Sequence, residues 1–214
     1  MGTGYRIVLA DDHQIVREGI RALLERHGHQ VCAEADDGHA ALMAIRKTEP
    51  DIALVDFSMP KLNGLDAIRE IPRHVPTVKA MLLTMHADQS YVLEALRAGA
   101  RAYVLKTQAA EDLAQAIEDV MHGKVYLSPG VVVTVVDAYL NGNDIPEDTL
   151  TGRERQVLQL VAEGHTTKKI ADMLNISFKT AESHRNRIMN KLDIHQTAGL
   201  VCYAIRKGLL DPWA

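Results

Sequence analysis

Over residues 1–125 the sequence alternates between two hydrophobic periods, and this alternation constrains the fold more than any other feature. Short apolar runs of strand length alternate with stretches whose apolar residues recur three and four positions apart. The strand-like runs are 6–10, 31–35, 52–55, 80–83 and 102–105, and the helical stretches are 15–24, 40–45, 65–71, 92–98 and 113–120. Parallel strands need crossover connections, so five such units predict an α/β fold with a doubly wound, five-stranded parallel sheet.

The alternation ends after Gly123. Residues 131–136 read Val-Val-Val-Thr-Val-Val, which fits either a sixth strand or a short linker helix. Residues 141–148 are polar and contain a glycine and a proline, as expected of a flexible linker. We therefore predict a first domain over 1–125, a linker over 126–148 and a second domain over 149–214.

The second domain has helical periodicity throughout. Thr151 and Glu154 form a capping-box pattern, which predicts a helix that ends at Gly164. Further helices are predicted over 168–174, over 178–192 with Ser177 as the N-cap, and over about 196–207. Two short helices joined by a tight turn, the second of them basic, predict a small, all-α, four-helix domain of the helix-turn-helix type.

Charge is divided unequally between the two predicted domains. The chain has a net charge of −4, but residues 150–214 carry 10 Lys+Arg and 6 Asp+Glu, a charge of +4, which leaves −8 for residues 1–149. A basic second domain is compatible with a polyanionic partner, although chance scatter of surface charge fits equally well.

Composition and cysteine usage limit the class of protein. No apolar run approaches the ~20 residues needed to span a bilayer, and no signal-peptide segment follows the start of the sequence. The two cysteines, Cys32 and Cys202, lie far apart without metal-ligand spacing, and the histidines outside the motifs below also lack such spacing. We expect a soluble, cytoplasmic protein without a membrane partner.

Polar residues follow four of the predicted strands, at the point where each apolar run ends. They are Asp11, Asp12, Asp56, Thr84 and Lys106. Any one of them could be a simple turn residue, but the carboxyl ends of parallel strands share one edge, where ligands bind. Three carboxylates at that edge would repel one another without a cation, and an oxygen-only ligand set favours Mg²⁺. With a lysine and a hydroxyl for phosphoryl oxygens, Asp56 is the predicted nucleophile that forms an acyl phosphate.

These residues also match a known family. The chain resembles the receiver domain of two-component response regulators, which has a flavodoxin-like fold. The residues that carry this resemblance are Asp11-Asp12, the segment DFSMP at 56–60, Asn63-Gly64, Thr84 and Lys106. Over 151–209 it resembles the LuxR-type helix-turn-helix domain, in the segments LTGRE at 150–154, KIA at 169–171 and KTAESH at 179–184. Both sets in this order resemble the NarL/FixJ family across nearly the whole chain apart from the linker.

The resemblance implies how the first domain is phosphorylated. Asp56 would be the phosphoacceptor and would receive a phosphoryl group from a partner histidine kinase. Asp12, Asp56 and the backbone carbonyl of Ser58 would bind Mg²⁺, and Asp11 would reach the ion directly or through water.

It also implies how the phosphoryl group is sensed. Lys106 would pair with the phosphoryl group, Thr84 would hydrogen-bond to it, and Tyr103 matches the switch aromatic, although an ordinary core tyrosine remains possible. Three further residues leave details open. Met85 stands where many receivers have a small residue and could narrow the entrance for small phosphodonors. Ser58 and His86 occupy the positions that tune the phosphoryl lifetime, although a plain loop histidine fits His86 equally well.

The third helix of the second domain carries the candidate DNA contacts. Its buried stripe is predicted to be Ala181, His184, Ile188 and Leu192. The opposite side offers cations for phosphates and polar groups for base edges in the major groove, although a solvated basic face is the plainer alternative. With the start of the preceding helix, the predicted contacts are Thr166, Thr167, Lys168, Lys179, Thr180, Glu182, Ser183, Asn186, Arg187 and Lys191.

The combined prediction is a response regulator that is phosphorylated on Asp56 and then binds promoter DNA, as a homodimer when phosphorylated or on DNA, and that is not an enzyme with a separate substrate. An aspartyl-phosphate hydrolase is disfavoured because its D-x-D pattern is replaced here by Asp11-Asp12-His13. A flavin carrier is disfavoured because adjacent carboxylates would repel the cofactor phosphate. The remaining alternative is a phosphorylation-independent regulator with an atypical receiver. The sequence names neither the kinase, the signal nor the target genes.

Overall fold

A computed structural model describes residues 4–140 and 149–210, which form two compact units on either side of the segment 141–148. The part of the predicted linker at 141–148 lies outside the described residues. Within the described ranges, no helix combines the length and the apolar character that crossing a membrane requires.

A six-stranded parallel sheet forms the centre of the first unit. Its strands are β1 (Arg6–Ala10), β2 (Gln30–Ala35), β3 (Ile52–Asp56), β4 (Lys79–Thr84), β5 (Ala102–Leu105) and β6 (Tyr126–Leu127), in the order β2-β1-β3-β4-β5-β6. The five predicted strands and their parallel arrangement are confirmed. The additional β6 is a two-residue edge strand, hydrogen-bonded beside β5, within the segment that the sequence predicted as linker.

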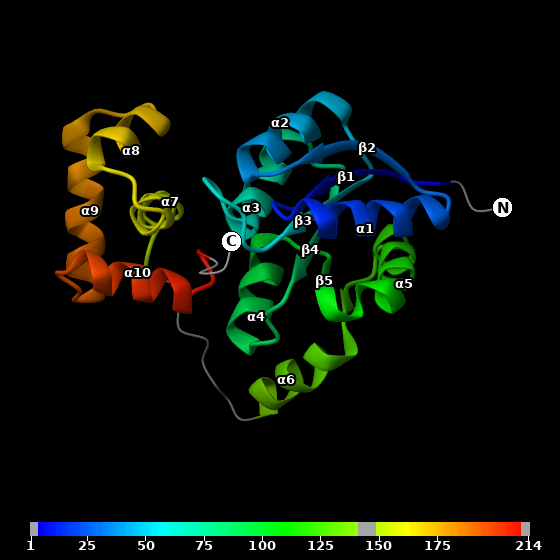
Figure 1. Cartoon of the computed structure of the whole chain (residues 1–214). Coiled ribbons are helices and arrows are strands. Elements are labelled where there is room, and N and C mark those ends of the chain that lie inside the picture. The colour runs from blue at the N-terminus through cyan, green and yellow to red at the C-terminus, as the bar shows by residue number, and fades with distance from the viewer. Residues whose placement is uncertain (1–3, 141–148, 211–214) are drawn as a thin grey trace. The chain divides into compact units, whose positions relative to one another are not determined.

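Five helices cover the two faces of this sheet (Figure 1). They are α1 (Gln14–Arg26), α2 (Gly38–Thr48), α3 (Gly64–His74), α4 (Gln89–Ala98) and α5 (Ala109–Met121), with a 3₁₀ turn, η1 (Lys106–Gln108), before α5. Helices α1 and α5 contact each other on one face, and α3 contacts both α2 and α4 on the other. Every residue of β3 is buried, because a strand covered on both faces is apolar along its whole length rather than at alternate positions.

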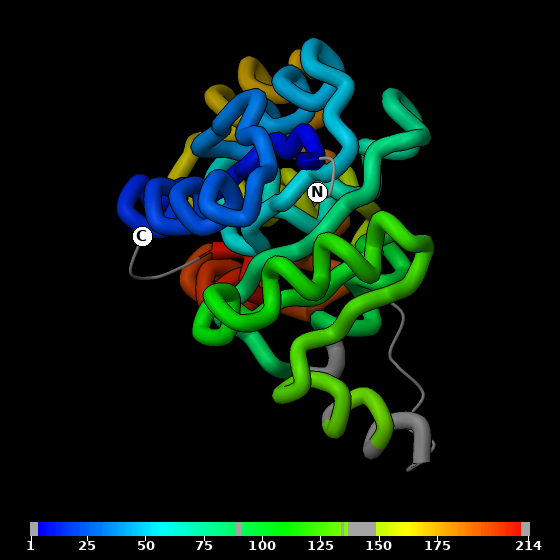
Figure 2. Tube along the Cα trace, turned by 90° about the vertical axis from the view of Figure 1, so that its right-hand side faces the viewer, coloured from blue at the N-terminus to red at the C-terminus, as the bar shows by residue number. Residues whose placement is uncertain are grey.

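The valine-rich segment forms a helix, α6 (Pro129–Leu140), which is one of the two alternatives that the sequence left open. It packs against α4, with Val131 fully buried and Val133 64% exposed. Figure 2 shows α5 and α6 as consecutive tubes at the near side of the first unit.

The second unit contains the four predicted helices, α7 (Gly152–Ala162), α8 (Thr167–Met173), α9 (Phe178–Leu192) and α10 (Thr197–Arg206). The predicted capping box of Thr151 and Glu154 begins α7, and the hydroxyl of Ser177 caps α9 by accepting from the Thr180 N–H. Apolar residues from all four helices form one core, including Val157, Ile170, Ala181, Ile188 and Leu200. The helix-turn-helix prediction is confirmed, with helix ends within one or two residues of the expected positions.

Candidate functional site

The predicted site residues of the first unit meet at the carboxyl edge of the sheet. After β1 the chain adds β2 on one side of it and then β3 on the other side. The strand order therefore reverses between β1 and β3. Asp11 follows β1, and Asp56 ends the neighbouring β3. Thr84 ends β4, and Lys106 follows β5.

A lysine bridges the two buried carboxylates at the centre of this edge. Lys106 Nζ lies 2.8 Å from Asp11 Oδ2 and 2.8 Å from Asp56 Oδ1. Asp11 and Asp56 are buried, whereas Asp12 is partly exposed, and Ser58 is partly exposed in the loop after β3. One ammonium cannot balance three carboxylates, so the pocket remains net negative with all groups ionised.

Burial and mutual repulsion shift the ionisation of this pocket. Burial raises the pKa of the Asp56 carboxyl, the Lys106 ammonium lowers it, and the charges of Asp11 and Asp12 raise it further, giving a pKa of about 7. Burial alone would lower the pKa of Lys106, but the charges of Asp56 and Asp11 outweigh this effect and raise it. The lysine therefore stays charged at neutral pH, while Asp56 is poised between its two ionisation states. The buried carboxylate oxygens fit a small, hard divalent cation, which would favour the ionised form of Asp56.

The loop after β3 closes tightly over Asp56. The Gly64 N–H donates to the Phe57 carbonyl at 2.9 Å, and the Asn63 side chain caps α3 by accepting from the Asp66 N–H. A Cβ at position 64 would lie 2.0 Å from the Asp56 carbonyl oxygen, which a real side chain cannot do. Only glycine allows this approach, and the loop thus fixes the backbone of Asp56.

The loop after β4 connects Thr84 to Tyr103 through His86. The His86 N–H donates to Thr84 Oγ1 at 3.0 Å, and the Tyr103 hydroxyl donates to the His86 carbonyl at 2.8 Å. Tyr103 is fully buried, and burial raises its pKa. The His86 ring also contacts two aromatic rings, those of Phe57 and Tyr91, at centroid distances of 5.4 and 5.1 Å. The side chain of Met85, next to Thr84, is exposed.

The sequence analysis did not single out His13 as part of this pocket. His13 Nδ1 lies 2.8 Å from Asp12 Oδ1, and His13 belongs with Asp11, Asp12 and Asp56 to a group whose potential ligand atoms lie within 4.8 Å of one another. His13 directly follows Asp11 and Asp12, so the sequence shows no recognisable metal-ligand spacing there. The direction of the chain after β1 brings the imidazole to the carboxylates.

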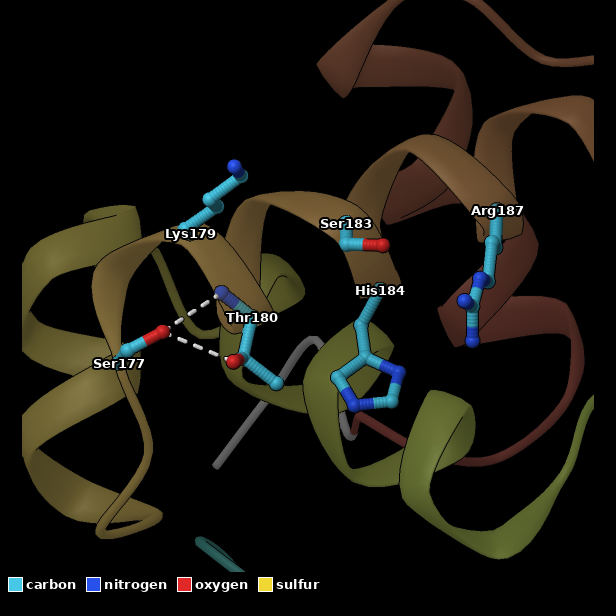
Figure 3. A pocket seen from close by; sticks show the side chains of 6 residues that line it. All are labelled: Ser177, Lys179, Thr180, Ser183, His184 and Arg187. Atoms are coloured by element: carbon cyan, nitrogen blue, oxygen red, sulfur yellow. Dashed lines mark hydrogen bonds between the residues drawn. The ribbon is translucent and has the colours of Figure 1, made fainter.

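In the second unit, the predicted DNA contacts lie on the outer surface of α8 and α9. All ten residues are exposed except Thr167, which is partly buried. Six residues line a shallow hollow on α9, shown in Figure 3: Ser177, Lys179, Thr180, Ser183, His184 and Arg187. The Ser177 hydroxyl bonds to both the N–H and the hydroxyl of Thr180, which holds the first turn in place.

His184 differs from its predicted place in the buried stripe. Ala181 and Ile188 are buried as predicted, and Leu192 is partly buried but packs against the same core. His184 is also only partly buried, and it lines the hollow (Figure 3). Burial lowers the pKa of His184, and the charges of Arg153 and Arg187 lower it further. The side chain is therefore neutral at pH 7.

Lys191 is engaged within the second unit. Its Nζ lies 2.7 Å from Glu154 Oε2, the carboxylate that completes the capping box at the start of α7. This ammonium is therefore held by a carboxylate on another helix.

Comparisons with known proteins match both units. The profile of the family described as "Response regulator receiver domain" matches residues 7–118, and that of "Bacterial regulatory proteins, luxR family" matches residues 148–204. The Oxygen regulatory protein NreC of Staphylococcus haemolyticus is 37% identical over 215 residues, covering 96% of this chain and 99% of the relative. The Transcriptional regulatory protein DegU of Brevibacillus brevis is 34% identical over 221 residues, covering 95% and 94%.

Solved structures give the same match. RcsB of Salmonella enterica serovar Typhimurium, bound to the promoter P1flhDC in the presence of the phosphomimetic BeF3-, aligns with a TM-score of 0.67 and 30% identity, covering 94% of this chain and 98% of that one. A LuxR-family two-component response regulator of Aurantimonas sp. SI85-9A1 aligns with a TM-score of 0.62 and 37% identity, covering 64% and 99%.

Proposed function

The chain belongs to the NarL/FixJ-type response regulators, transcriptional regulators that join a receiver domain to a LuxR-type DNA-binding domain, and we propose that phosphorylation of Asp56 controls its binding to promoter DNA. The observation that carries this proposal is the Lys106 ammonium 2.8 Å from both Asp11 and Asp56. A buried carboxylate can act as the nucleophile for a phosphoryl group, and a cation beside it can pair with the phosphoryl oxygens after the transfer.

The phosphoryl group would come from a phosphohistidine of a partner kinase. An Asp56 carboxylate oxygen attacks the phosphorus, the P–N bond breaks, and the departing imidazole nitrogen takes a proton. The product is an acyl phosphate on Asp56. Lys106 then pairs with the phosphoryl oxygens, which offsets the charge that the transfer adds to the pocket.

The acidic pocket would hold Mg²⁺ through Asp11, Asp12, Asp56 and the backbone carbonyl of Ser58. When bound, the ion supplies positive charge to the phosphoryl oxygens. Carboxylate oxygens are the ligands that Mg²⁺ prefers. Burial, with a smaller effect of the Asp11 and Asp12 charges, raises the pKa of Asp56, so a bound cation would favour its ionised form.

Thr84 and Tyr103 would report the phosphoryl group to the surface. Thr84 Oγ1 accepts from the His86 N–H, and Tyr103 donates to the His86 carbonyl, so both side chains hold the same residue. A Thr84 hydroxyl that turns to the phosphoryl group loses its bond to His86, and the loop and Tyr103 must then adjust together.

The second unit would read promoter DNA with α9 in the major groove. Exposed cations such as Lys179 and Arg187 would contact phosphates, and Glu182, Ser183 and Asn186 would contact base edges. The start of α8, at Thr166, Thr167 and Lys168, and Thr180 on α9 would add phosphate contacts. We retain Lys191 only as a residue that stabilises the second unit, because Glu154 holds its ammonium.

The domain limits proposed from the sequence are 1–125 for the receiver, 126–148 for the linker and 149–214 for the DNA-binding domain. A homodimer is expected when the protein is phosphorylated or on DNA, because promoter half-sites are usually read by two-fold symmetric proteins. Because its proposed target is promoter DNA, we expect the protein in the cytoplasm. It would act there as a regulator and not as an enzyme with a separate substrate.

Incubation with Mg²⁺ and a small phosphodonor, followed by intact-mass measurement and sizing, tests this proposal. The wild type should gain one base-labile phosphate and a larger dimer population. Asp56→Asn should gain none, because an amide is not a usable nucleophile. Asp36→Asn, which changes an exposed carboxylate after β2, is the matched control and should behave as wild type.

Lys106→Ala should still form the adduct but fail to dimerise, because the cation that couples the phosphoryl group to the switch is lost. A phosphate on Asp56→Asn would show that the acceptor is wrong. A wild type that binds DNA specifically but gains no phosphate, even from a kinase, would favour the phosphorylation-independent regulator.

A further inference from the structure

Ser128 joins the last residues of β5 to the start of α6. It directly follows β6 and precedes Pro129, the first residue of α6, and it is fully buried. Its N–H donates to the Tyr103 carbonyl at 3.0 Å, and its hydroxyl accepts from the Leu105 N–H at 3.1 Å. Its carbonyl accepts from the Val131 N–H at 2.8 Å, in the first turn of α6. One residue thus holds two alternate positions of β5 and begins the helix that follows.

A buried carboxylate orients the Ser128 hydroxyl. The strand β6 ends at Leu127, and at the next position along this side of β5 the hydroxyl takes the place of a strand carbonyl. A hydroxyl has one hydrogen to donate, and the buried Asp112 of α5 accepts it. Because the hydrogen is used in this bond, the oxygen lone pairs are left for the Leu105 N–H. Asp112 therefore fixes the direction in which Ser128 holds β5.

The end of β5 that Ser128 holds determines where the pocket lysine begins. Leu105 directly precedes Lys106, whose ammonium lies 2.8 Å from each of the two buried carboxylates of the acidic pocket. The Lys106 side chain is 11% exposed and starts at the first position after the strand. A shift of the Leu105 backbone therefore changes the point from which the ammonium reaches the carboxylates.

Solvent does not reach the bond between Ser128 and Leu105. Both residues are buried, and so is Val131 in the first turn of α6. A Cβ added to Gly130 would lie 3.4 Å from Leu105 Cδ1, so the start of α6 closes directly over the end of β5. A buried N–H that loses its acceptor is costly, and the backbone must then move to find another partner.

We propose that Ser128, oriented by Asp112, is a positioning residue for Lys106. Its hydroxyl fixes the backbone of Leu105 and thereby the place of the lysine ammonium between the carboxylates of the acidic pocket. The effect on phosphate uptake rests on the proposed function, whereas the position of the ammonium can be measured without any phosphate.

Competitive acetylation of the full chain with a trace of acetic anhydride, followed by peptide mass measurement, tests the position of the ammonium. In Ser128→Ala the acetylation rate of Lys106, relative to that of the exposed Lys47 on α2, should rise about threefold or more. An ammonium that leaves its ion pairs loses its proton more easily and meets the reagent more often. Thr48→Val removes a hydroxyl bond to a backbone carbonyl on α2, so it is the matched control and should leave this ratio unchanged.

A double-mutant cycle on phosphate uptake separates positioning from a general structural role. With Mg²⁺ and acetyl phosphate, Ser128→Ala should slow uptake about three- to tenfold, because a displaced cation stabilises the transferred charge less. In a Lys106→Ala background the same substitution should change the rate less than about 1.5-fold, since no ammonium remains to be positioned. A merely structural role would slow uptake by the same factor in both backgrounds.

A second variant covers the case in which Ser128→Ala folds poorly because Asp112 loses its donor. Ser128→Ala combined with Asp112→Asn removes the stranded charge and should keep both the faster Lys106 acetylation and the slow uptake. Normal acetylation and uptake in this pair would mean that the single variant acts through the stranded carboxylate. Unchanged acetylation in Ser128→Ala, or equal slowing of uptake in both backgrounds, would mean that Ser128 does not position Lys106. Each of these results overturns the inference.

The proposed function fails separately. If the wild type takes up no phosphate while Ser128→Ala raises the acetylation of Lys106, the positioning role stands and the phosphoacceptor role does not. If Asp56 is phosphorylated but neither acetylation nor uptake responds to Ser128→Ala, the proposed function stands and this inference falls.

Discussion

Replacing Lys191 with methionine should destabilise the DNA-binding unit without removing a DNA contact. Glu154 is buried, and its Oε2 accepts from the Thr151 N–H at 2.8 Å, the Thr151 hydroxyl at 3.0 Å and Lys191 Nζ at 2.7 Å. The lysine is the only cation among these three donors. Methionine keeps the length of the side chain but leaves the carboxylate without its countercharge.

The expected cost follows from the burial of the two partners. Hydrogen bonds to charged groups contribute about 1.5–3 kcal/mol, and the lower end applies here because the Lys191 side chain is 39% exposed while that of Glu154 is 4% exposed. We expect a loss of about 1.5–2 kcal/mol for Lys191→Met, and a coupling energy of about 1–2 kcal/mol in a double-mutant cycle with Glu154→Gln.

The cost should depend on pH in a defined direction. Burial raises the pKa of Glu154, but the hydrogen bonds from Lys191 and Thr151 outweigh it and hold the pKa below its ordinary value of 4.5. A carboxyl whose pKa is lower in the folded state stabilises the fold above its unfolded pKa, and that stabilisation disappears as the pH falls through the folded pKa. The effect of Lys191→Met should therefore be complete at pH 7 and shrink below about pH 4.5.

Hydrogen exchange of the full chain, followed by peptide mass measurement, resolves the second unit from the first. Peptides of α7 and α9 should exchange roughly 10- to 30-fold faster in Lys191→Met at pH 7, since ~1.4 kcal/mol is a factor of ten in the opening constant. Lys179→Met is the control on the same helix. The Lys179 side chain is exposed and points away from the other labelled side chains (Figure 3), so its replacement should leave hydrogen exchange unaltered.

DNA titrations over a range of salt complete the comparison. Lys179→Met should lower the slope of log K against log salt by roughly one unit, and Lys191→Met should not. Unchanged exchange together with a lowered salt slope in Lys191→Met would refute the reasoning and restore Lys191 as a phosphate contact.

Two further predictions concern the two units separately. Gly64→Ala should displace the Asp56 backbone and abolish phosphate uptake in the mass assay. Gly19→Ala is the contrasting change on α1, where an added Cβ meets nothing within 4 Å. It should stabilise the fold by about 0.5–1 kcal/mol in urea unfolding. Normal uptake in Gly64→Ala would show that the loop tolerates the shift. Glu182→Ala should strengthen non-specific DNA binding and relax preference at one base pair per half-site by about 5- to 150-fold, since a good base contact contributes ~1–3 kcal/mol. A binding-site selection that returns the same consensus at uniformly higher affinity would exclude base reading by Glu182.

Features fixed by local chemistry were predictable from the sequence. The strands appear where apolar runs are bounded by polar residues, and the caps at Thr151 and Ser177 lie where hydroxyl residues precede helical patterns. The placement of Asp11 and Asp56 at one edge needed only the rule that parallel strands point the same way. Each of these depends on the order of neighbouring residues or on one general rule of topology.

Contacts between distant parts of the chain were not predictable in this way. Lys191 and Glu154 are 37 residues apart. The helical pattern assigns Lys191 to the polar side of α9, but it cannot tell whether the partner of its ammonium is a DNA phosphate or a carboxylate on another helix. His184 was placed in the buried stripe by its spacing, but a spacing of three or four residues gives the face and not the depth of burial. His13 was overlooked because its hydrogen-bond partner, Asp12, is adjacent in sequence and forms no recognisable motif with it.

The valine-rich segment shows why one element stayed ambiguous although its composition was clear. Val131 is buried, whereas Val132, Val133 and Val136 are 41%, 64% and 48% exposed, which is the pattern of a helix with one face on α4. When nearly every position is apolar, the sequence contains no contrast from which a period of 2 or 3.6 can be measured, and valine itself favours strands. A local signal for a helix is Pro129, since proline is well suited to the first helical position. The burial of Val131 and the packing of α6 against α4 agree with the helix, so this element depends on tertiary packing as well as on its start signal.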